Sequence, residues 1–231
     1  MFKNITNKKI YQEVINQIQD MILTGKLKKG DKLISERELS ENMGVSRTSI
    51  REALRVLETM GIIESKQGEG NFICNNIEAS LIQPLSMMFT LNNGSYEDIL
   101  ELRSMIELEA VKLAAIRGTE DEIEELKMIS QYLMKKDGKF DKSELDKDLH
   151  HKIACMSKNF LIKSLYAISS NLLENFIENS REQIVNYYHE EEILNVQHKQ
   201  ICDAIVSREP EKAYMYMKEH LDLIKNTIDK I

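Results

Sequence analysis

The chain of 231 residues has little proline or glycine, with two Pro and nine Gly, which is too few for a collagen-like or disordered chain. Cysteine is also scarce. The three cysteines, Cys74, Cys155 and Cys202, lack CxxC spacing, which excludes a disulfide framework and favours a reducing cytoplasm. No apolar run approaches the roughly 18 residues that span a bilayer, and the Lys-bearing N-terminus lacks the apolar core of a signal peptide. We therefore expect a globular cytoplasmic protein.

Charge is distributed unevenly along the chain. The net charge is −7, but residues 1–75 hold 12 Lys and Arg against 10 Asp and Glu, which gives +2. The remaining residues hold 19 against 28, which gives −9. Because attraction to phosphate is local, an acidic second domain does not forbid nucleic-acid binding by the first. The length allows a small domain over 1–75 and a larger one over 76–231.

The first 75 residues show helical and then strand-like patterns. Apolar residues at helical spacing predict a helix over 7–24. Ser35 and Glu38 form a capping box for a helix that ends near Met43. After a tight Gly turn, Ser46 caps a third helix that ends near residue 60. Two short apolar pieces around a Gly-rich turn then predict a β-hairpin. This order of elements predicts a winged helix-turn-helix.

The remainder of the chain shows almost uninterrupted helical periodicity from residue 77 to 231 and no convincing strand. The expected breaks fall at 92–94, Gly118, 137–138, 158–159, 187–189 and 207–210. We predict six or seven helices packed as a bundle. The expected fold class is therefore mainly α, with an N-terminal winged helix-turn-helix and a C-terminal all-α bundle.

The third predicted helix has the features of a DNA-recognition helix. It begins with Ser46, Arg47, Thr48 and Ser49, and Arg51 follows one turn later. A helix N-terminus attracts phosphate, and arginine suits bidentate pairing with guanine. In an isolated helix, a plain cap and solvated arginines would be the better interpretation. The complete order of elements favours DNA binding.

Three histidines and one aspartate suggest a metal site in the bundle. Asp146 and His150 lie four residues apart on one predicted helix, and so share a face. His198 and His220 lie on the apolar stripes of two further helices. One carboxylate and three imidazoles suit Zn²⁺, Ni²⁺ or Mn²⁺. Ordinary core histidines explain the pattern about equally well, so both interpretations stay open. His151 and His189 receive no role, because both have charged neighbours.

The N-terminal motifs resemble the DNA-binding domain of the GntR superfamily over residues 8–74. They read LISEREL at 33–39 and GVSRTSIREAL at 44–54, followed by Gly61 and by GEG at 68–70. Ile34 stands where Pro is commonest in the family, and Glu69 places an acid at the tip of the wing. The resemblance implies DNA contacts from Arg37, Ser46, Arg47, Thr48, Ser49 and Arg51, with Gly68 at a wing tip that enters the minor groove.

Residues 78–228 resemble the FCD domain of FadR-type GntR regulators. The resemblance rests on Asp146 to His150 with the residues that follow, on His198 and His220 in their helices, and on ELR at 101–103 with Glu107. It implies a divalent metal held by Asp146, His150, His198 and His220, which helps to bind a small organic acid. Arg103 is the candidate for a second carboxylate anchor, although an interhelical ion pair would equally explain an arginine there.

Together the two resemblances imply a non-enzymatic transcription regulator, most simply a repressor. A homodimer would bind a palindromic operator, and a small carboxylate effector would complete the metal coordination and shift the two DNA-binding domains. Three alternatives remain. A metal with an open position could activate water in a hydrolase, the chain could sense metal without an organic effector, or it could sense an acyl chain. The four candidate ligands argue against the last.

Overall fold

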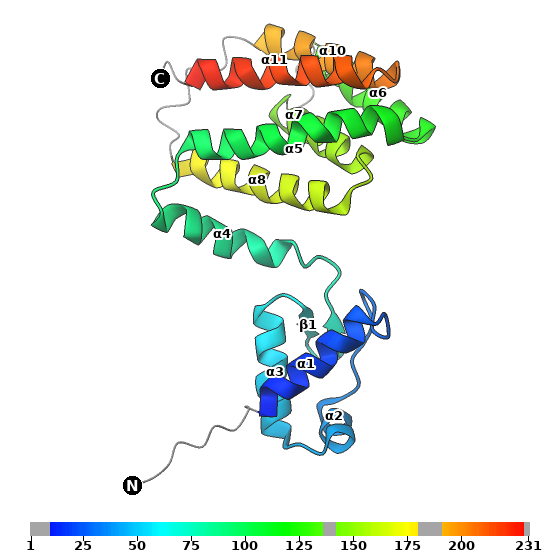
Figure 1. The fold of residues 1–231 in the computed structure, drawn as a ribbon, viewed down its shortest axis with the longest axis vertical. Coiled ribbons are helices and arrows are strands. Elements are labelled where there is room, and N and C mark those ends of the chain that lie inside the picture. Colours follow the sequence, from blue (N-terminus) through cyan, green and yellow to red (C-terminus); the bar gives the residue numbers. More distant parts are fainter. Residues whose placement is uncertain (1–9, 136–141, 180–190, 229–231) are drawn as a thin grey trace. The chain divides into compact units, whose positions relative to one another are not determined.

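The computed structural model describes residues 10–135, 142–179 and 191–228 (Figure 1). By its internal contacts the chain divides into two compact units, Met1–Pro84 and Leu85–Ile231. We refer to these as the N-terminal and the C-terminal unit.

Up to residue 75, the described residues form three helices and a hairpin, as the sequence predicted. The elements are α1 (Ile10–Leu23), α2 (Glu36–Met43), α3 (Arg47–Thr59), β1 (Ile63–Lys66) and β2 (Gly70–Ile73). The Ser35–Glu38 capping box begins α2, and Gly44 ends it in the left-handed conformation with φ 65°, which glycine adopts at little cost. Apolar residues on one side of each helix, including Ile15, Ile50 and Leu57, form the core. This core fixes which face of α3 remains exposed.

The hairpin follows α3 directly. β1 and β2 pair antiparallel, with Ile63 opposite Ile73 and Lys66 opposite Gly70. Gly68 lies in the connecting turn with φ 78°, and no heavy atom would lie within 4 Å of a Cβ built there. The turn is therefore held by backbone conformation and leaves an open tip, as expected for a wing.

From residue 77 onward, the described residues form helices and no strand. The helices are α4 (Ala79–Leu91), α5 (Tyr96–Arg117), α6 (Glu120–Met134), α7 (Lys142–Met156), α8 (Phe160–Asn179), α10 (Glu191–Val206) and α11 (Pro210–Ile228). Seven described helices agree with the prediction of six or seven. The predicted breaks at 137–138 and 187–189 lie outside the described residues, and the other four fall between helices.

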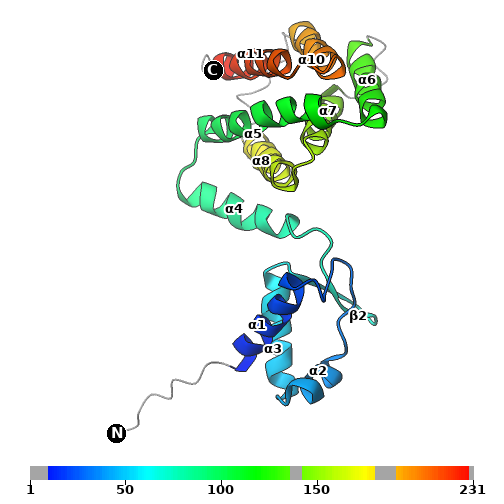
Figure 2. The same cartoon turned by 45° about the vertical axis from the view of Figure 1, so that its right-hand side comes forward.

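Helix α5 lies at the centre of the bundle. It contacts α7, α8, α10 and α11, and Figure 2 shows α11 along one of its sides and α8 along another. The core includes Ala110, Ala114 and Leu149 together with Ile201 and Met217. Small alanines on α5 allow its neighbours to approach closely, which brings α7, α10 and α11 around a common interior.

Candidate metal centre and nucleic-acid interface

The structure brings the four candidate metal ligands together. Asp146 and His150 lie on α7, His198 on α10 and His220 on α11. One potential ligand atom from each of the four lies within 4.8 Å of the others. The ring centroids of His198 and His220 are 4.5 Å apart, and that of His150 lies 5.5 and 5.2 Å from them. Three separate helices thus converge on one polar cluster, which we call the histidine cluster.

The three imidazoles are buried while the carboxylate reaches the surface. His150, His198 and His220 are 2%, 2% and 1% exposed, whereas the side chain of Asp146 is 43% exposed. Oδ1 of Asp146 lies 3.0 Å from Nε2 of His198 and 3.9 Å from Nε2 of His150. The cluster is therefore open to solvent on the Asp146 side.

The hydrogen bonds made or missing at the ring nitrogens show whether these residues fit a metal. Nδ1 of His150 contacts Oε2 of Glu107, and Nδ1 of His220 lies 3.2 Å from Oε1 of Gln197. Both nitrogens of His198 and Nε2 of His220 are buried without a hydrogen bond. Unpaired buried polar atoms are costly. A divalent cation would bind one nitrogen of His198 together with Nε2 of His220, and an outer hydrogen-bond partner such as those of His150 and His220 is typical of metal-binding histidines. The donor set therefore fits such an ion.

The electrostatics of the histidine cluster also suit a cation. Burial acts to raise the pKa of the Asp146 carboxyl, but the nearby imidazoles of His198 and His150 outweigh it and hold that pKa below its usual range. Burial lowers the pKa of His220 well below its ordinary value, and the other two imidazoles lower it further. At neutral pH Asp146 is thus ionised and His220 neutral, which are the states that bind metal. For His150, burial acts to lower the pKa but Glu107 outweighs it and raises that pKa, so a metal would displace a proton from this ring.

Arg103 is buried on α5 and forms an ion pair with Glu107, four residues later on the same helix. Nε of Arg103 lies 2.7 Å from Oε1 of Glu107. This contact does not use the two terminal nitrogens of the guanidinium. Burial acts to raise the pKa of Glu107, but Arg103 and His150 outweigh it and lower that pKa to about 2. The ion pair is therefore within one helix, not between helices as the alternative interpretation of Arg103 supposed.

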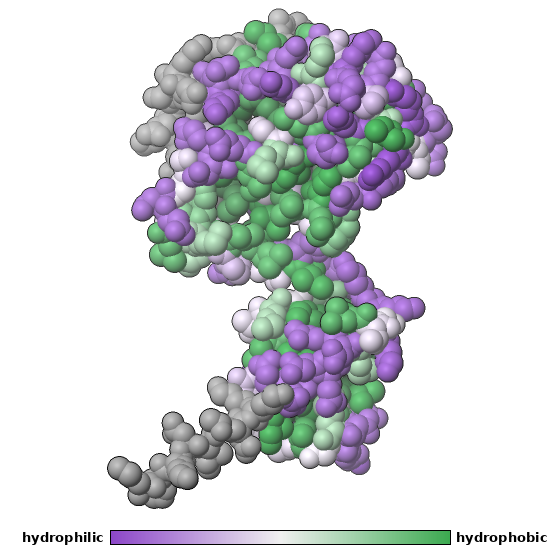
Figure 3. All heavy atoms as spheres, in the orientation of Figure 1, coloured by the Kyte–Doolittle hydropathy of each residue, from purple (hydrophilic) through white to green (hydrophobic). Residues whose placement is uncertain are grey.

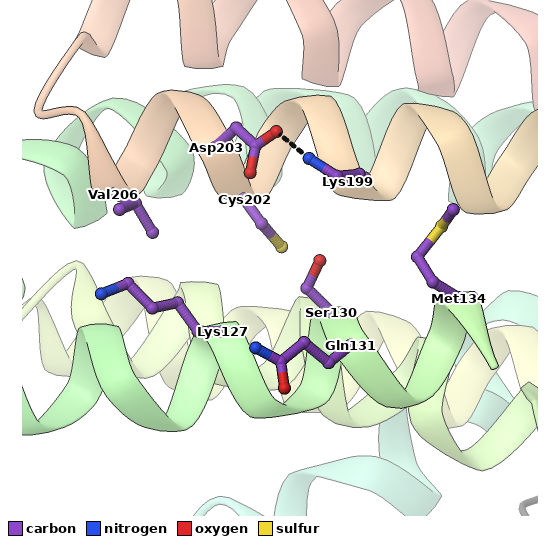
Figure 4. A pocket seen from close by; sticks show the side chains of 8 residues that line it. All are labelled: Lys127, Ser130, Gln131, Met134, Lys199, Cys202, Asp203 and Val206. Atoms are coloured by element: carbon purple, nitrogen blue, oxygen red, sulfur yellow. Dashed lines mark hydrogen bonds and ion pairs between the residues drawn. The ribbon is translucent and has the colours of Figure 1, made fainter.

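A cleft of about 380 Å³ lies elsewhere in the bundle, between α6 and α10 (Figure 4). Its lining includes Lys127, Lys199 and the buried Cys202, and none of the four candidate metal ligands. Each lysine is already paired with a carboxylate on its own helix. Burial raises the pKa of the Cys202 thiol to about 12, so this cysteine is an unreactive core residue. Cys74 and Cys155 are half-buried.

The exposed face of α3 carries the predicted DNA-binding residues. Ser46 caps the helix by accepting a hydrogen bond from the backbone N–H of Ser49. The side chains of Arg47 and Arg51 are both 60% exposed, while Leu54 and Leu57 are buried. The arginines point away from the core, and the free N–H groups of the first turn lie beside them. This surface can bind phosphate and the edges of bases.

Glu36 on α2 contacts both arginines of this surface. Its Oε2 lies 2.8 Å from Nε of Arg51 and 3.8 Å from Nη2 of Arg47. Thr48 is exposed and Ser49 half-buried, and Arg37 on α2 forms an exposed ion pair with Glu41. The predicted residues of α2 and α3 are thus accessible.

Sequence reasoning missed three partners of the predicted site residues. Glu107 and Gln197 contact histidines of the cluster, and Glu36 contacts the arginines of α3. Only Glu107 carried a usable signal, since a carboxylate four residues after Arg103 is ion-pair spacing on a helix. The contact of Gln197 with His220 and that of Glu36 with the arginines each join two different helices. They depend on tertiary packing, which residue spacing does not reveal.

A winged helix-turn-helix with an exposed arginine-bearing helix, followed by a helical bundle, defines a class of DNA-binding transcription regulators. Curated proteins support this class. The chain is 33% identical to the HTH-type transcriptional regulator YcbG of Bacillus subtilis, over 98% of this chain and 93% of that protein. It is 31% identical to the HTH-type transcriptional regulator LutR of the same organism, over 90% and 96%. It is 27% identical to the Glc operon transcriptional activator of Escherichia coli, over 96% and 90%.

Residues 10–73 match the model of bacterial regulatory proteins of the gntR family, and residues 98–223 match the FCD domain. A solved structure of Streptococcus agalactiae GntR is similar, with a TM-score of 0.68 and 26% identity over 94% of this chain and 99% of that one. The chain belongs to the gntR family of bacterial regulators and carries an FCD domain. Its role is that of a transcription regulator and is not enzymatic, as predicted. No described helix is long and apolar enough to cross a membrane.

Proposed function

We propose that the chain is a cytoplasmic repressor whose binding to operator DNA is controlled by a small organic acid at a divalent-metal centre. The observation that carries this proposal is the histidine cluster, in which three buried imidazoles and one carboxylate converge without enough hydrogen-bond partners. Asp146, His150, His198 and His220 would hold Zn²⁺, Ni²⁺ or Mn²⁺. The bound ion would supply a Lewis-acidic position for a carboxylate.

The solvent-facing side of the histidine cluster would give a small effector a route to the metal. Asp146 is the ligand that reaches solvent, so an effector would approach past it. Arg103 is connected to His150 of the cluster through Glu107 and has two terminal nitrogens outside that contact, and a guanidinium suits a carboxylate partner. We propose that Arg103 binds a second polar group of the acid. Dicarboxylates or hydroxycarboxylates would then bind more tightly than simple monocarboxylates.

DNA binding is proposed to use Arg37, Ser46, Arg47, Thr48, Ser49 and Arg51, with Gly68 at the wing. The N-terminus of α3 would enter the major groove, with Arg47 and Arg51 directed at base edges. Contacts to phosphate would position the unit, while these arginines would supply the sequence preference. Glu69 at the wing tip carries the same charge as phosphate, so the wing is expected to add less affinity than α3.

A homodimer on a palindromic operator is proposed because one small domain buries too little surface for tight specific binding. The C-terminal unit has an apolar area on the side of α5 and α8 (Figure 3). Exposed apolar residues on these two helices include Met105, Phe160 and Leu161, which are 75%, 55% and 66% exposed. Exposed apolar groups of this size are typical of interfaces, and a second copy of the chain is the proposed partner.

The test is to measure metal content and operator affinity together. Elemental analysis of the full-length protein is expected to find about one divalent ion per chain. Isothermal titration with acetate, lactate and succinate is then performed on metal-loaded and chelated protein. Binding of at least one acid should require the metal, and that acid should change operator affinity in a fluorescence anisotropy assay.

Two outcomes would contradict parts of the proposal. Metal that binds and alters operator affinity, with no response to any acid, would favour a metal-sensing regulator without an organic effector. Metal-free protein that still responds to an acid would reduce the histidine cluster to polar core packing.

A further inference from the structure

Glu107 links the candidate effector anchor to a candidate metal ligand. Its Oε1 accepts a hydrogen bond from Nε of Arg103 at 2.7 Å, and its Oε2 contacts Nδ1 of His150. All three residues are buried, with Glu107 only 2% exposed. Arg103 and Glu107 lie one turn apart on α5, while His150 lies on α7. One carboxylate therefore spans the packed α5–α7 interface.

The chemistry of this contact fixes the orientation of His150. An ionised carboxylate only accepts hydrogen bonds, so the hydrogen between Glu107 and His150 belongs to Nδ1. When the ring is neutral, Nε2 is its electron-pair donor, and it lies 3.9 Å from Oδ1 of Asp146, inside the histidine cluster. Rotation of the ring would break a buried charged contact. His150 is thereby held in the tautomer and direction that a metal needs.

The histidines of the cluster are not held in the same way. Nδ1 of His220 lies 3.2 Å from the neutral amide oxygen of Gln197, and Nδ1 of His198 has no hydrogen bond. Of the three rings, His150 alone contacts a carboxylate outside the cluster, among the described residues. Within the described part of the chain, it is also the only one whose partner contacts Arg103.

We propose that Glu107 is a positioning residue that sets metal affinity through His150 and couples Arg103 to the metal centre through the same carboxylate. This inference rests on the proposed metal centre. Arg103 donates a hydrogen bond to Oε1 of Glu107, so a change at Arg103 would alter the contact between Glu107 and His150. Arg103 itself contacts none of the four candidate ligands. An acid that draws Arg103 toward itself would be sensed at the metal, and metal binding would in turn favour one position of Arg103.

The test measures Zn²⁺ affinity of the full-length protein by competition with a chromophoric chelator. The variants are Glu107→Gln, Arg103→Met, the double variant and Glu101→Gln. Glu101 is the matched control, because it lies on the same helix but its side chain is 69% exposed and 4.0 Å from Lys225. Glu107→Gln is expected to weaken Zn²⁺ binding by about 10- to 100-fold, and Glu101→Gln to leave it unchanged. Arg103→Met is expected to weaken it less.

The double variant tests the coupling. If Arg103 acts through Glu107, the double variant should bind Zn²⁺ no more weakly than Glu107→Gln alone. Additive losses would overturn the coupling. Glu107→Gln alone leaves the buried charge of Arg103 uncompensated and could prevent folding. The double variant removes both buried charges together, and in that case its Zn²⁺ affinity is compared with that of the wild type.

Histidine ¹⁵N spectra supply a readout that does not depend on measured affinities. With Zn²⁺ bound, Nε2 of His150 should coordinate the metal and Nδ1 should carry a proton protected from exchange. That protection should disappear in Glu107→Gln. Coordination through Nδ1, or equal Zn²⁺ affinity of Glu107→Gln and wild type, would overturn the inference while the metal centre stands. Wild-type protein that binds no Zn²⁺ would overturn the proposed function as well.

Discussion

Replacement of His198 by leucine is expected to change the free energy of unfolding in opposite directions with and without zinc. Nδ1 of His198 is buried without a hydrogen bond, Nε2 has only its 3.0 Å contact with Asp146, and an unpaired buried polar atom costs about 1–3 kcal/mol. Leucine is of similar size and has no polar atoms. Without metal, the variant should therefore be as stable as the wild-type protein or more stable, by about 1 kcal/mol.

Zinc should reverse this order. At a free zinc concentration about 100 times the dissociation constant, binding stabilises the folded protein by about 2.7 kcal/mol. If loss of one of four ligands weakens binding about 100-fold, the same zinc concentration stabilises the variant by about 0.4 kcal/mol. The wild type should then gain about 2 kcal/mol more than the variant. For a chain of this size this corresponds to about 4–8 °C in melting temperature.

The assay is urea unfolding followed by circular dichroism, in the presence of zinc or of a chelator. His151→Leu is the matched control, since His151 is exposed on α7 and should show the same zinc-dependent stabilisation as the wild type. Equal destabilisation of His198→Leu with zinc and with chelator would refute the reasoning, because His198 would then contribute only packing. The Asp146 carboxylate, which lies 3.0 Å from His198, keeps its contact with solvent in the variant.

Three further outcomes are expected. Arg47→Ala and Arg51→Ala should each weaken specific operator binding by about 1–3 kcal/mol, measured by anisotropy at physiological salt, and wild-type affinity in both would mean that α3 does not recognise the operator. Gly44→Ala should destabilise the N-terminal unit by about 1–2 kcal/mol, because φ is 65° and alanine is strained in the left-handed region. No neighbour lies within 4 Å of an added Cβ, so a steric clash would not contribute, and an unchanged unfolding curve would contradict this. Light scattering should give twice the mass of one chain at concentrations that saturate the operator, whereas a monomer there would exclude the proposed dimer.

Local sequence determined the helices and the hairpin of this protein. Capping boxes such as Ser35 with Glu38 satisfy the first N–H groups of a helix within four residues of chain, so they are visible without any tertiary information. The same holds for Ser46 and for the Gly-rich turn of the hairpin. Helical spacing also placed His150, His198 and His220 on inward faces, because burial of a helix face follows its apolar stripe. The family motifs added the grouping of these histidines with Asp146.

Only the tertiary structure decided which buried groups meet and in what geometry. Spacing could not establish that α7, α10 and α11 bring their polar residues within 4.8 Å of one another, since that depends on how three helices pack around α5. It also could not show that Arg103 pairs with Glu107 and that Glu107 reaches His150 on another helix. Side-chain direction and helix packing fix these contacts, and both arise from the whole core rather than from any single segment.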